Sequence, residues 1–236
     1  MPKIRYLKVQ FANPIFPAEI PYFRAAVIEA TQRESSLFHN HTDDKGVIYR
    51  YPLIQYKVTE RKASIICIEQ GTDDIHYLFQ QRDLKLRIGE REESFTIEDI
   101  HLQYFNIQLW QSRLHYALKD WQALNQENYQ RYLGLLTEVE RLQMLEGLLR
   151  GNLLALATGI GWQVPAPIEV GITRLKEERR LRYKGQPVLC FSLNFHTNVS
   201  LPEYVGLGKG VSVGFGGVRR MGEERVVDDN RMSNIL

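Results

Sequence analysis

The sequence predicts an α+β protein made of two tandem modules, each with the element order β-α-β-β-α-β. Three observations lead to this prediction. The length of 236 residues fits one large domain or two small ones. Short apolar stretches typical of strands alternate along the chain with stretches of helical periodicity. With 44% hydrophobic and 25% charged residues, the composition is that of a folded globular protein and excludes a disordered one.

The first half of the chain contains this order of elements once. Alternation over Ile4–Phe11 predicts a strand, and prolines follow it. Apolar residues spaced by three or four predict an amphipathic helix from Ala18 to about Arg33. The remaining predicted elements are strands at Val47–Val58, Ala63–Ile68 and Leu84–Ile88, with a short helix at Ile75–Gln81. This order is that of a ferredoxin-like, or RRM-like, unit.

The second half is interpreted in the same way. Extended segments lie around residues 107–118, and a helical period runs from about Glu127 to Thr158 until Gly159 and Gly161 end it. Further strands are predicted at Ile168–Thr173, Leu181–Tyr183 and Val188–Phe195. The most linker-like segment is Gly89–Ser94, so we expect an N-terminal domain at 1–92 and a C-terminal domain at 93–236. No internal repeat is visible, and the duplication rests on element order alone.

The expected location is the cytoplasm. No apolar run approaches the ~20 residues that cross a bilayer, which excludes a transmembrane helix. The start of the sequence lacks the apolar core of a signal peptide. Cys67 and Cys190 lie inside apolar runs, where they are typical of buried thiols in a reducing compartment.

Positive charge is concentrated in one part of the chain. The formal net charge is only +2, but residues 174–220 contain nine basic and three acidic residues. Such a stretch can form a polyanion site. It can equally be a solvated hairpin with charged edges.

A glycine-rich segment near the C-terminus is the first candidate for function. Its candidate binding residues are Gly206, Gly208, Lys209, Gly210, Ser212, Gly214, Gly216, Arg219 and Arg220. Glycine allows a backbone to approach a ligand and to turn its N–H groups toward an anion. The lysine and the two arginines add charge for phosphates. No helix of a dinucleotide-binding unit can follow, and no P-loop pattern is present, so the alternative is a flexible glycine-rich hairpin.

A polar loop with two histidines is the second candidate. His39 and His41 can act as general base and general acid, because imidazole titrates near neutral pH. With Asp43 or Asp44 they could instead form half of a metal site. An exposed loop with two incidental histidines is the third interpretation. The other four histidines lie on helix or strand patterns and are assigned structural roles.

Both candidates resemble parts of one family. The segment Gly206–Gly216, preceded by Asn198–Pro202, resembles the glycine-rich loop of RAMP-superfamily proteins. Together with Phe16–Pro21, the histidine pair and Tyr49–Lys57, it is most similar to the CRISPR repeat-processing endoribonucleases with paired histidines. Residues 90–185 contribute element order but no motif to this resemblance.

The resemblance implies a tandem ferredoxin-like fold that binds CRISPR repeat RNA across a basic surface and the glycine-rich loop. It implies cleavage without metal or cofactor, by attack of a ribose 2′-OH, leaving a 2′,3′-cyclic phosphate and a 5′-OH. His39 and His41 would exchange the protons, Lys45 would stabilise the charged phosphorane, and Tyr49 would orient or protonate, or simply be structural.

Two other functions remain open. The first is a non-catalytic RAMP subunit that binds RNA within a CRISPR effector complex. The second is a small-molecule enzyme on a ferredoxin-like scaffold. We expect a monomer or a homodimer, with other CRISPR-associated proteins as further candidate partners and no membrane contact.

Overall fold

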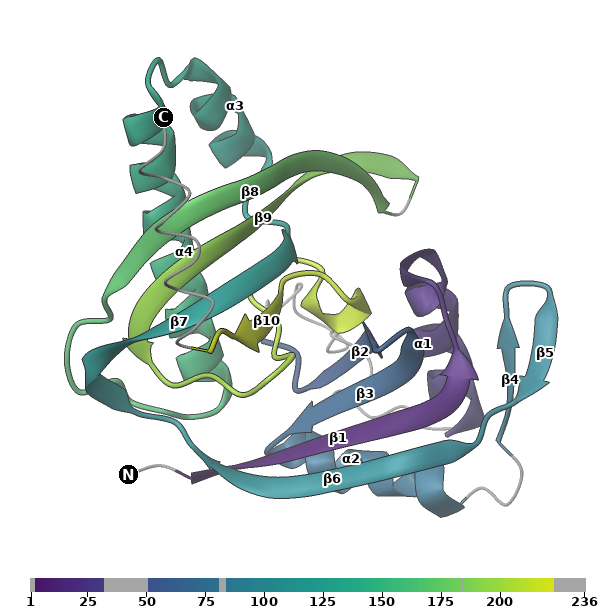
Figure 1. The fold of residues 1–236 in the computed structure, drawn as a ribbon. Coiled ribbons are helices and arrows are strands. Elements are labelled where there is room, and N and C mark those ends of the chain that lie inside the picture. The colour runs from purple at the N-terminus through teal and green to yellow at the C-terminus, as the bar shows by residue number, and fades with distance from the viewer. Residues whose placement is uncertain (1–2, 32–50, 81–83, 184, 223–236) are drawn as a thin grey trace, which may run out of the picture. The chain divides into compact units, whose positions relative to one another are not determined.

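The computed structural model describes residues 3–31, 51–80, 84–183 and 185–222 (Figure 1). By its internal contacts the chain divides into two compact units. Within the described residues, the first unit contains the chain up to Asn106 together with Ala155–Gln163 and Gly210–Gly214. The second unit contains the remaining residues. The two units are therefore not simple consecutive halves of the sequence.

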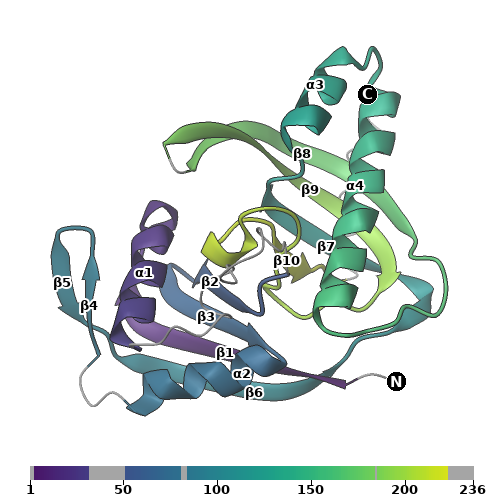
Figure 2. The same ribbon diagram turned by 180° about the vertical axis from the view of Figure 1, so that it is seen from behind.

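The first unit is a four-stranded antiparallel sheet with helices on one face (Figure 2). The strands, in the order β2-β3-β1-β6, are β1 (Lys3–Pro14), β2 (Ile54–Thr59), β3 (Lys62–Ile68) and β6 (Ile97–Asn106). The helices are α1 (Ile20–Ala30), α2 (Gln70–Asp74) and the 3₁₀ turns η1 (Pro17–Glu19) and η2 (Ile75–Gln80). This strand order confirms the predicted ferredoxin-like unit.

The fourth strand of this sheet differs from the prediction. The sequence suggests Leu84–Ile88, but β4 (Lys85–Ile88) pairs only with β5 (Arg91–Ser94) in a separate hairpin. The sheet position is taken by β6, which pairs along β1 from Lys3 opposite Asn106 to Phe11 opposite Ile97. A four-residue strand cannot match the length of β1, whereas β6 can. The expected domain division at 92/93 falls before β6, which belongs to the sheet of the first unit.

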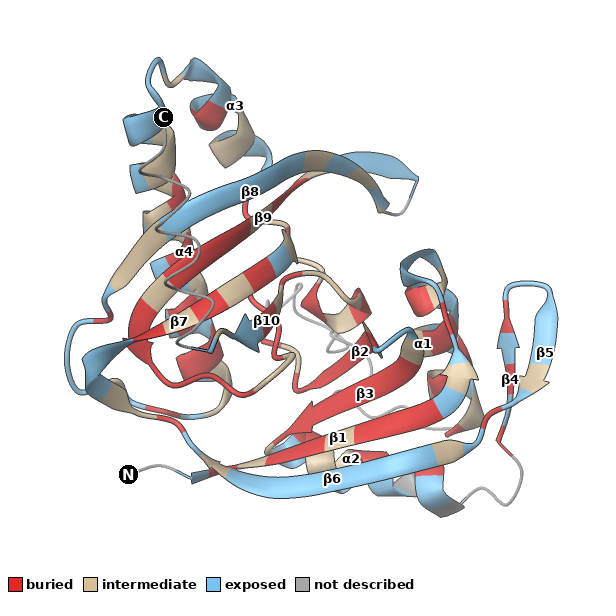
Figure 3. Ribbon diagram, in the orientation of Figure 1, coloured by how far each residue is buried: buried red, intermediate tan, exposed pale blue. Residues whose placement is uncertain are grey.

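Aromatic rings form the core of the first unit. The ring of Phe23 in α1 contacts those of Phe11 and Tyr56 edge-on and stacks on that of Phe95, with centroids 5.5–5.7 Å apart. Figure 3 shows the resulting pattern, with buried residues along β1, β2 and β3 and exposed residues along β6. The hydrophobic effect therefore fixes α1 against the inner strands of the sheet.

The second unit repeats the strand order of the first. Its strands, in the order β10-β7-β9-β8, are β7 (Leu109–Trp121), β8 (Val170–Tyr183), β9 (Gln186–Val199) and β10 (Gly217–Arg220). Helices α3 (Gln126–Gly134) and α4 (Glu138–Gly159) connect β7 to β8, and α4 lies over one face of the sheet (Figure 2). None of the helices among the described residues is long and apolar enough to cross a membrane.

The long helix predicted from Glu127 to Thr158 is in fact two helices. The chain turns to extended backbone at Leu135, and the side chain of Glu140 accepts hydrogen bonds from the backbone and hydroxyl of Thr137. This reciprocal cap begins a new helix where the apolar period alone predicts continuation. The predicted end of α4 at Gly159 is confirmed.

One element of the repeated order is missing from the second unit. Between β9 and β10, where the first unit has α2 and η2 between β3 and the last strand, the described chain forms only the 3₁₀ turn η3 (Val211–Val213). The glycine-rich segment occupies this position. It replaces the second helix of the motif.

Candidate nucleic-acid interface

The glycines of this segment meet steric requirements of the fold. Gly208 has φ +89°, and a Cβ there would lie 2.6 Å from the Trp121 ring and 2.9 Å from the carbonyl oxygen of Gln122. Gly216 has φ +65°, and a Cβ there would overlap the carbonyl group of Leu207. Only glycine adopts such backbone conformations without strain and leaves this space open. The glycine density therefore reflects close packing of the chain on itself.

Several amide groups of the segment already donate hydrogen bonds. The donors and acceptors are Leu207 N to Gly216 O (2.9 Å), Lys209 N to Gln122 O (3.0 Å) and Gly216 N to Asp120 O (3.1 Å). These three N–H groups are occupied, so they do not face an anion in the way that the glycine density predicts. At these three positions, phosphate can be bound only by side chains.

Three cationic side chains of the second unit accompany the segment. Lys209 is half-exposed, and its amino group makes no hydrogen bond or ion pair to any residue that the structure describes. Arg219 and Arg220 are exposed on β10, with guanidinium groups 5.7 Å from the Tyr204 ring and 6.0 Å from the Tyr116 ring. Such cation–π contacts orient a guanidinium without cancelling its charge. These side chains suit the binding of phosphate groups.

The predicted binding residues divide between the two units. Gly206, Gly208, Lys209, Gly216, Arg219 and Arg220 belong to the second unit, whereas Gly210, Ser212 and Gly214 belong to the first. In the first unit, η3 packs against β2 and α1, and Gly214, with φ +101°, lies against the Ile20 side chain.

The predicted catalytic residues His39, His41, Lys45 and Tyr49 lie outside the described residues, as do Asp43 and Asp44. Within the described ranges, no group of three His, Cys, Asp or Glu side chains is arranged to hold a metal ion. Tyr51, the first described residue after this stretch of sequence, is buried, and its hydroxyl accepts a hydrogen bond from Gln55 Nε2 at 3.0 Å. Burial raises the pKa of Tyr51, so its phenol stays protonated.

The first unit contains a buried lysine that its sequence pattern does not identify as a candidate. Lys57 in β2 is only 4% exposed and lies opposite Ser64 of β3, next to the buried polar side chains of Thr59 and Gln10. Burial lowers the pKa of Lys57 to about 7. Its amine can therefore exist in either protonation state near neutral pH. The only signal in the sequence is a lysine among the apolar residues of a predicted strand.

Exposed charge on β8 explains part of the basic stretch. Arg179 is engaged by Asp120 at 2.6 Å and so has a structural role. Lys176 and Arg182 are exposed and make no ion pair with any residue described in the structure. Since β8 is an edge strand of its sheet, these charges are accessible to a polyanion and also protect the edge against pairing.

Two ferredoxin-like units, the second with a glycine-rich segment in place of a helix, define a tandem protein of the RAMP type. Comparison with family models specifies the family. Residues 2–106 match the Cas6b N-terminal domain, and residues 108–221 match the Cas6b C-terminal domain. The chain belongs to the Cas6b family, which confirms the resemblance that the sequence motifs indicate.

Solved structures confirm the fold. A crystal structure of Cas6b has a TM-score of 0.84 and 26% identity, covering 93% of this chain and 100% of that one. The structure of a CRISPR RNA processing endoribonuclease Cas6b has a TM-score of 0.71 and 24% identity, with coverage of 93% and 100%. An uncharacterised protein of Methanocaldococcus jannaschii is 34% identical over 106 residues, which is 45% of this chain and 71% of the relative.

Proposed function

We propose that this protein is an endoribonuclease that cleaves precursor CRISPR RNA within its repeats. The observation that carries the proposal is the match of residues 2–106 and 108–221 to the two Cas6b domains. A similar structure is that of a CRISPR RNA processing endoribonuclease, which supports the same activity. The accessible cations beside the glycine-rich segment supply the charge that an RNA substrate requires.

The proposed reaction is a transesterification without metal. The 2′-oxygen of the scissile nucleotide attacks the adjacent phosphorus, the bond from phosphorus to the 5′-oxygen breaks, and the products are a 2′,3′-cyclic phosphate and a 5′-OH. Of His39 and His41, one accepts the 2′ proton and the other donates a proton to the 5′-oxygen. Lys45 stabilises the charged phosphorane, and Tyr49 orients the reacting groups.

The proposed RNA contacts outside this centre are the side chains of Lys209, Arg219 and Arg220. Each is accessible, and a charged hydrogen bond to a phosphate oxygen is stronger than a neutral one. The glycines keep the backbone in a conformation that presents these side chains. Their role in binding is indirect.

The experiment is incubation of the purified protein with a repeat RNA in EDTA, followed by analysis of the product ends. A 2′,3′-cyclic phosphate and a 5′-OH support the proposal, and an RNA with 2′-deoxyribose at the scissile position should remain intact. Binding without cleavage would instead identify a non-catalytic RNA-binding subunit. Cleavage that stops in EDTA and returns with Mg²⁺ would contradict the metal-independent reaction.

A further inference from the structure

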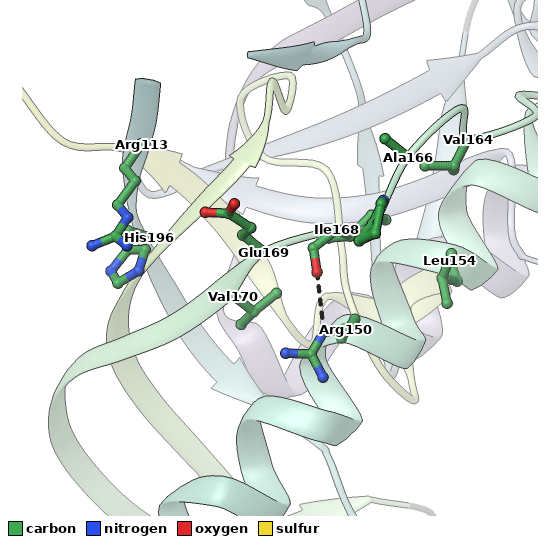
Figure 4. Close-up of a pocket in the computed structure, with 10 residues that line it drawn as sticks. Arg113, Arg150, Leu154, Val164, Ala166, Ile168, Glu169, Val170 and His196 are labelled. Carbon is green, nitrogen blue, oxygen red and sulfur yellow. Dashed lines mark hydrogen bonds between the residues drawn. The ribbon is translucent and has the colours of Figure 1, made fainter. Parts of the chain in front are cut away.

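The second unit contains a pocket away from the glycine-rich segment. Its volume is about 580 Å³, within the range of small-molecule sites. In Figure 4, Arg113 and His196 project from β7 and β9, Arg150 projects from α4, and Glu169 comes from the segment that leads into β8. None of these residues belongs to the interface described above. The pocket thus combines two guanidinium groups, an imidazole and a carboxylate.

Arg150 is oriented for a ligand with two acceptor atoms. Its Nε donates a hydrogen bond to the carbonyl oxygen of Ile168 at 3.1 Å, drawn as a dashed line in Figure 4. Its two terminal amino groups make no hydrogen bond to any residue within the described ranges. One edge of the guanidinium is therefore fixed by the protein while the other remains available. This is the arrangement that recognises a phosphate in a bidentate manner.

Arg113 and His196 form the other polar wall. Arg113 is exposed and has no carboxylate partner among the described residues. The His196 ring occupies the space over Gly171 on the neighbouring strand, where a Cβ would overlap it. Burial lowers the pKa of His196, and the nearby Arg113 and His115 lower it further. The carboxylates of Glu146 and Glu169 raise the pKa, but their effect is smaller. The imidazole is therefore neutral near pH 7 and offers a flat ring beside the guanidinium of Arg113.

The remaining walls favour a nucleotide over an isolated phosphate. The Glu169 carboxylate repels anions, but it can accept hydrogen bonds from the amino group of a base, as acidic side chains do with cytosine. The side chains of Leu154, Val164 and Ala166 line an apolar wall against which a base can pack. A pocket for phosphate alone needs neither the carboxylate nor the apolar wall. A nucleotide uses both through its base, and it uses Arg150 through its phosphate.

We propose that this pocket binds one unpaired nucleotide of the RNA substrate, with its phosphate on Arg150 and its base beside Arg113, His196 and Glu169. The inference rests on the proposed RNA-cleaving function and adds a specificity site to it. Because RNA-binding proteins read sequence mostly in unpaired nucleotides, this site would contribute selectivity that the glycine-rich segment cannot provide.

The test measures the Kd of a repeat RNA that carries 2′-deoxyribose at the scissile position, by fluorescence anisotropy at fixed salt. Arg113→Ala and Arg150→Lys should each weaken binding about tenfold, since each removes a charged or bidentate contact. Arg131→Ala is the matched control, because it removes one exposed arginine of the same unit from α3. It should change Kd less than about twofold.

A scan of abasic substitutions along the same RNA tests base recognition. One unpaired position should weaken binding to the wild-type protein, and the same substitution should have little further effect on Arg113→Ala. Equal Kd values for Arg113→Ala, Arg150→Lys and the control, in a wild-type protein that binds and cleaves the repeat, would overturn the pocket assignment alone. A wild-type protein that does not bind the repeat would overturn the proposed function as well.

Discussion

Replacement of Lys57 by methionine should stabilise the protein in a manner that depends on pH. The lysine is buried in β2, and its pKa is lowered from 10.5 to about 7. The folded state therefore binds a proton less tightly than the unfolded state does. Methionine fills a similar volume without a charge, so the variant does not bear the cost of burying an ammonium group.

The magnitude follows from the two pKa values. Between about pH 7 and pH 10.5 the unfolded chain binds more protons at this lysine than the folded chain, so the wild-type free energy of unfolding rises with pH. Each pH unit in this range adds about 1.4 kcal/mol to the free energy of unfolding. The advantage of Lys57→Met should therefore be nearly constant below pH 7 and fall by about 2 kcal/mol between pH 7 and pH 9, because half of the folded chains still bind the proton at pH 7.

The assay is urea denaturation of both proteins at closely spaced pH values from 6 to 9. Loss of hydrogen bonds made by the Lys57 amino group would change the free energy of unfolding of the variant by a similar amount at every pH. The test is therefore the slope of the free energy of unfolding against pH. The same replacement at Lys85, which is exposed in β4, is the matched control because its amino group stays in water. Wild-type and Lys57→Met curves that run parallel over this range would refute the reasoning.

Three further predictions concern the glycine-rich segment and the histidine pair. Lys209→Ala should weaken RNA binding by ~1–3 kcal/mol in a filter-binding assay and lose this effect as salt rises, because a phosphate contact is removed; a salt-independent loss would argue against such a contact. Gly208→Ala should lower the free energy of unfolding by ~2–4 kcal/mol from backbone strain and overlap with the indole beneath it. Gly217→Ala, with open space at its Cβ, should be nearly neutral in the same denaturation experiment. His39→Ala or His41→Ala should slow single-turnover cleavage by roughly 10²–10⁴-fold at little change in Kd; wild-type rates in the double variant would remove the pair from the mechanism.

The sequence predicts element types better than it predicts pairing partners. Alternation and periodicity mark β1, β3, β9 and α1, because those patterns follow directly from which face is buried. They divide β8 into two strands, and they miss β10. They do not mark β6 as part of the first sheet. Its residues are almost all exposed, so an edge strand of this kind carries no burial pattern to recognise. Its place is determined by its length and by hydrogen bonds to β1, which only the folded chain reveals.

The candidate site likewise combines features that are local in the sequence with features that form only on folding. Glycine density and nearby cations are local features, so the glycine-rich segment can be found from sequence. The pocket of Arg113, Arg150 and His196 cannot, because its members come from β7, α4 and β9 and meet only after folding. The strand pattern around His196 predicts only a structural role for this side chain. Its position over Gly171 depends on a register that no single strand encodes.

The glycine-rich segment stands between β9 and β10, where the first unit has helices. Its backbone and its side chains have different tasks, since the backbone packs on the protein and the side chains present positive charge. The amides of Lys209 and Gly216 are bound to carbonyl groups at the end of β7 and beyond it, and Gly208 lies against Trp121. Gly208 and Gly216 therefore hold their part of the segment on the sheet of the second unit, while the side chains of Lys209, Arg219 and Arg220 remain accessible. Substitution of the glycines should reduce stability first and affinity only as a consequence. Substitution of the cations should reduce affinity at unchanged stability, and this contrast follows from which atoms are already engaged.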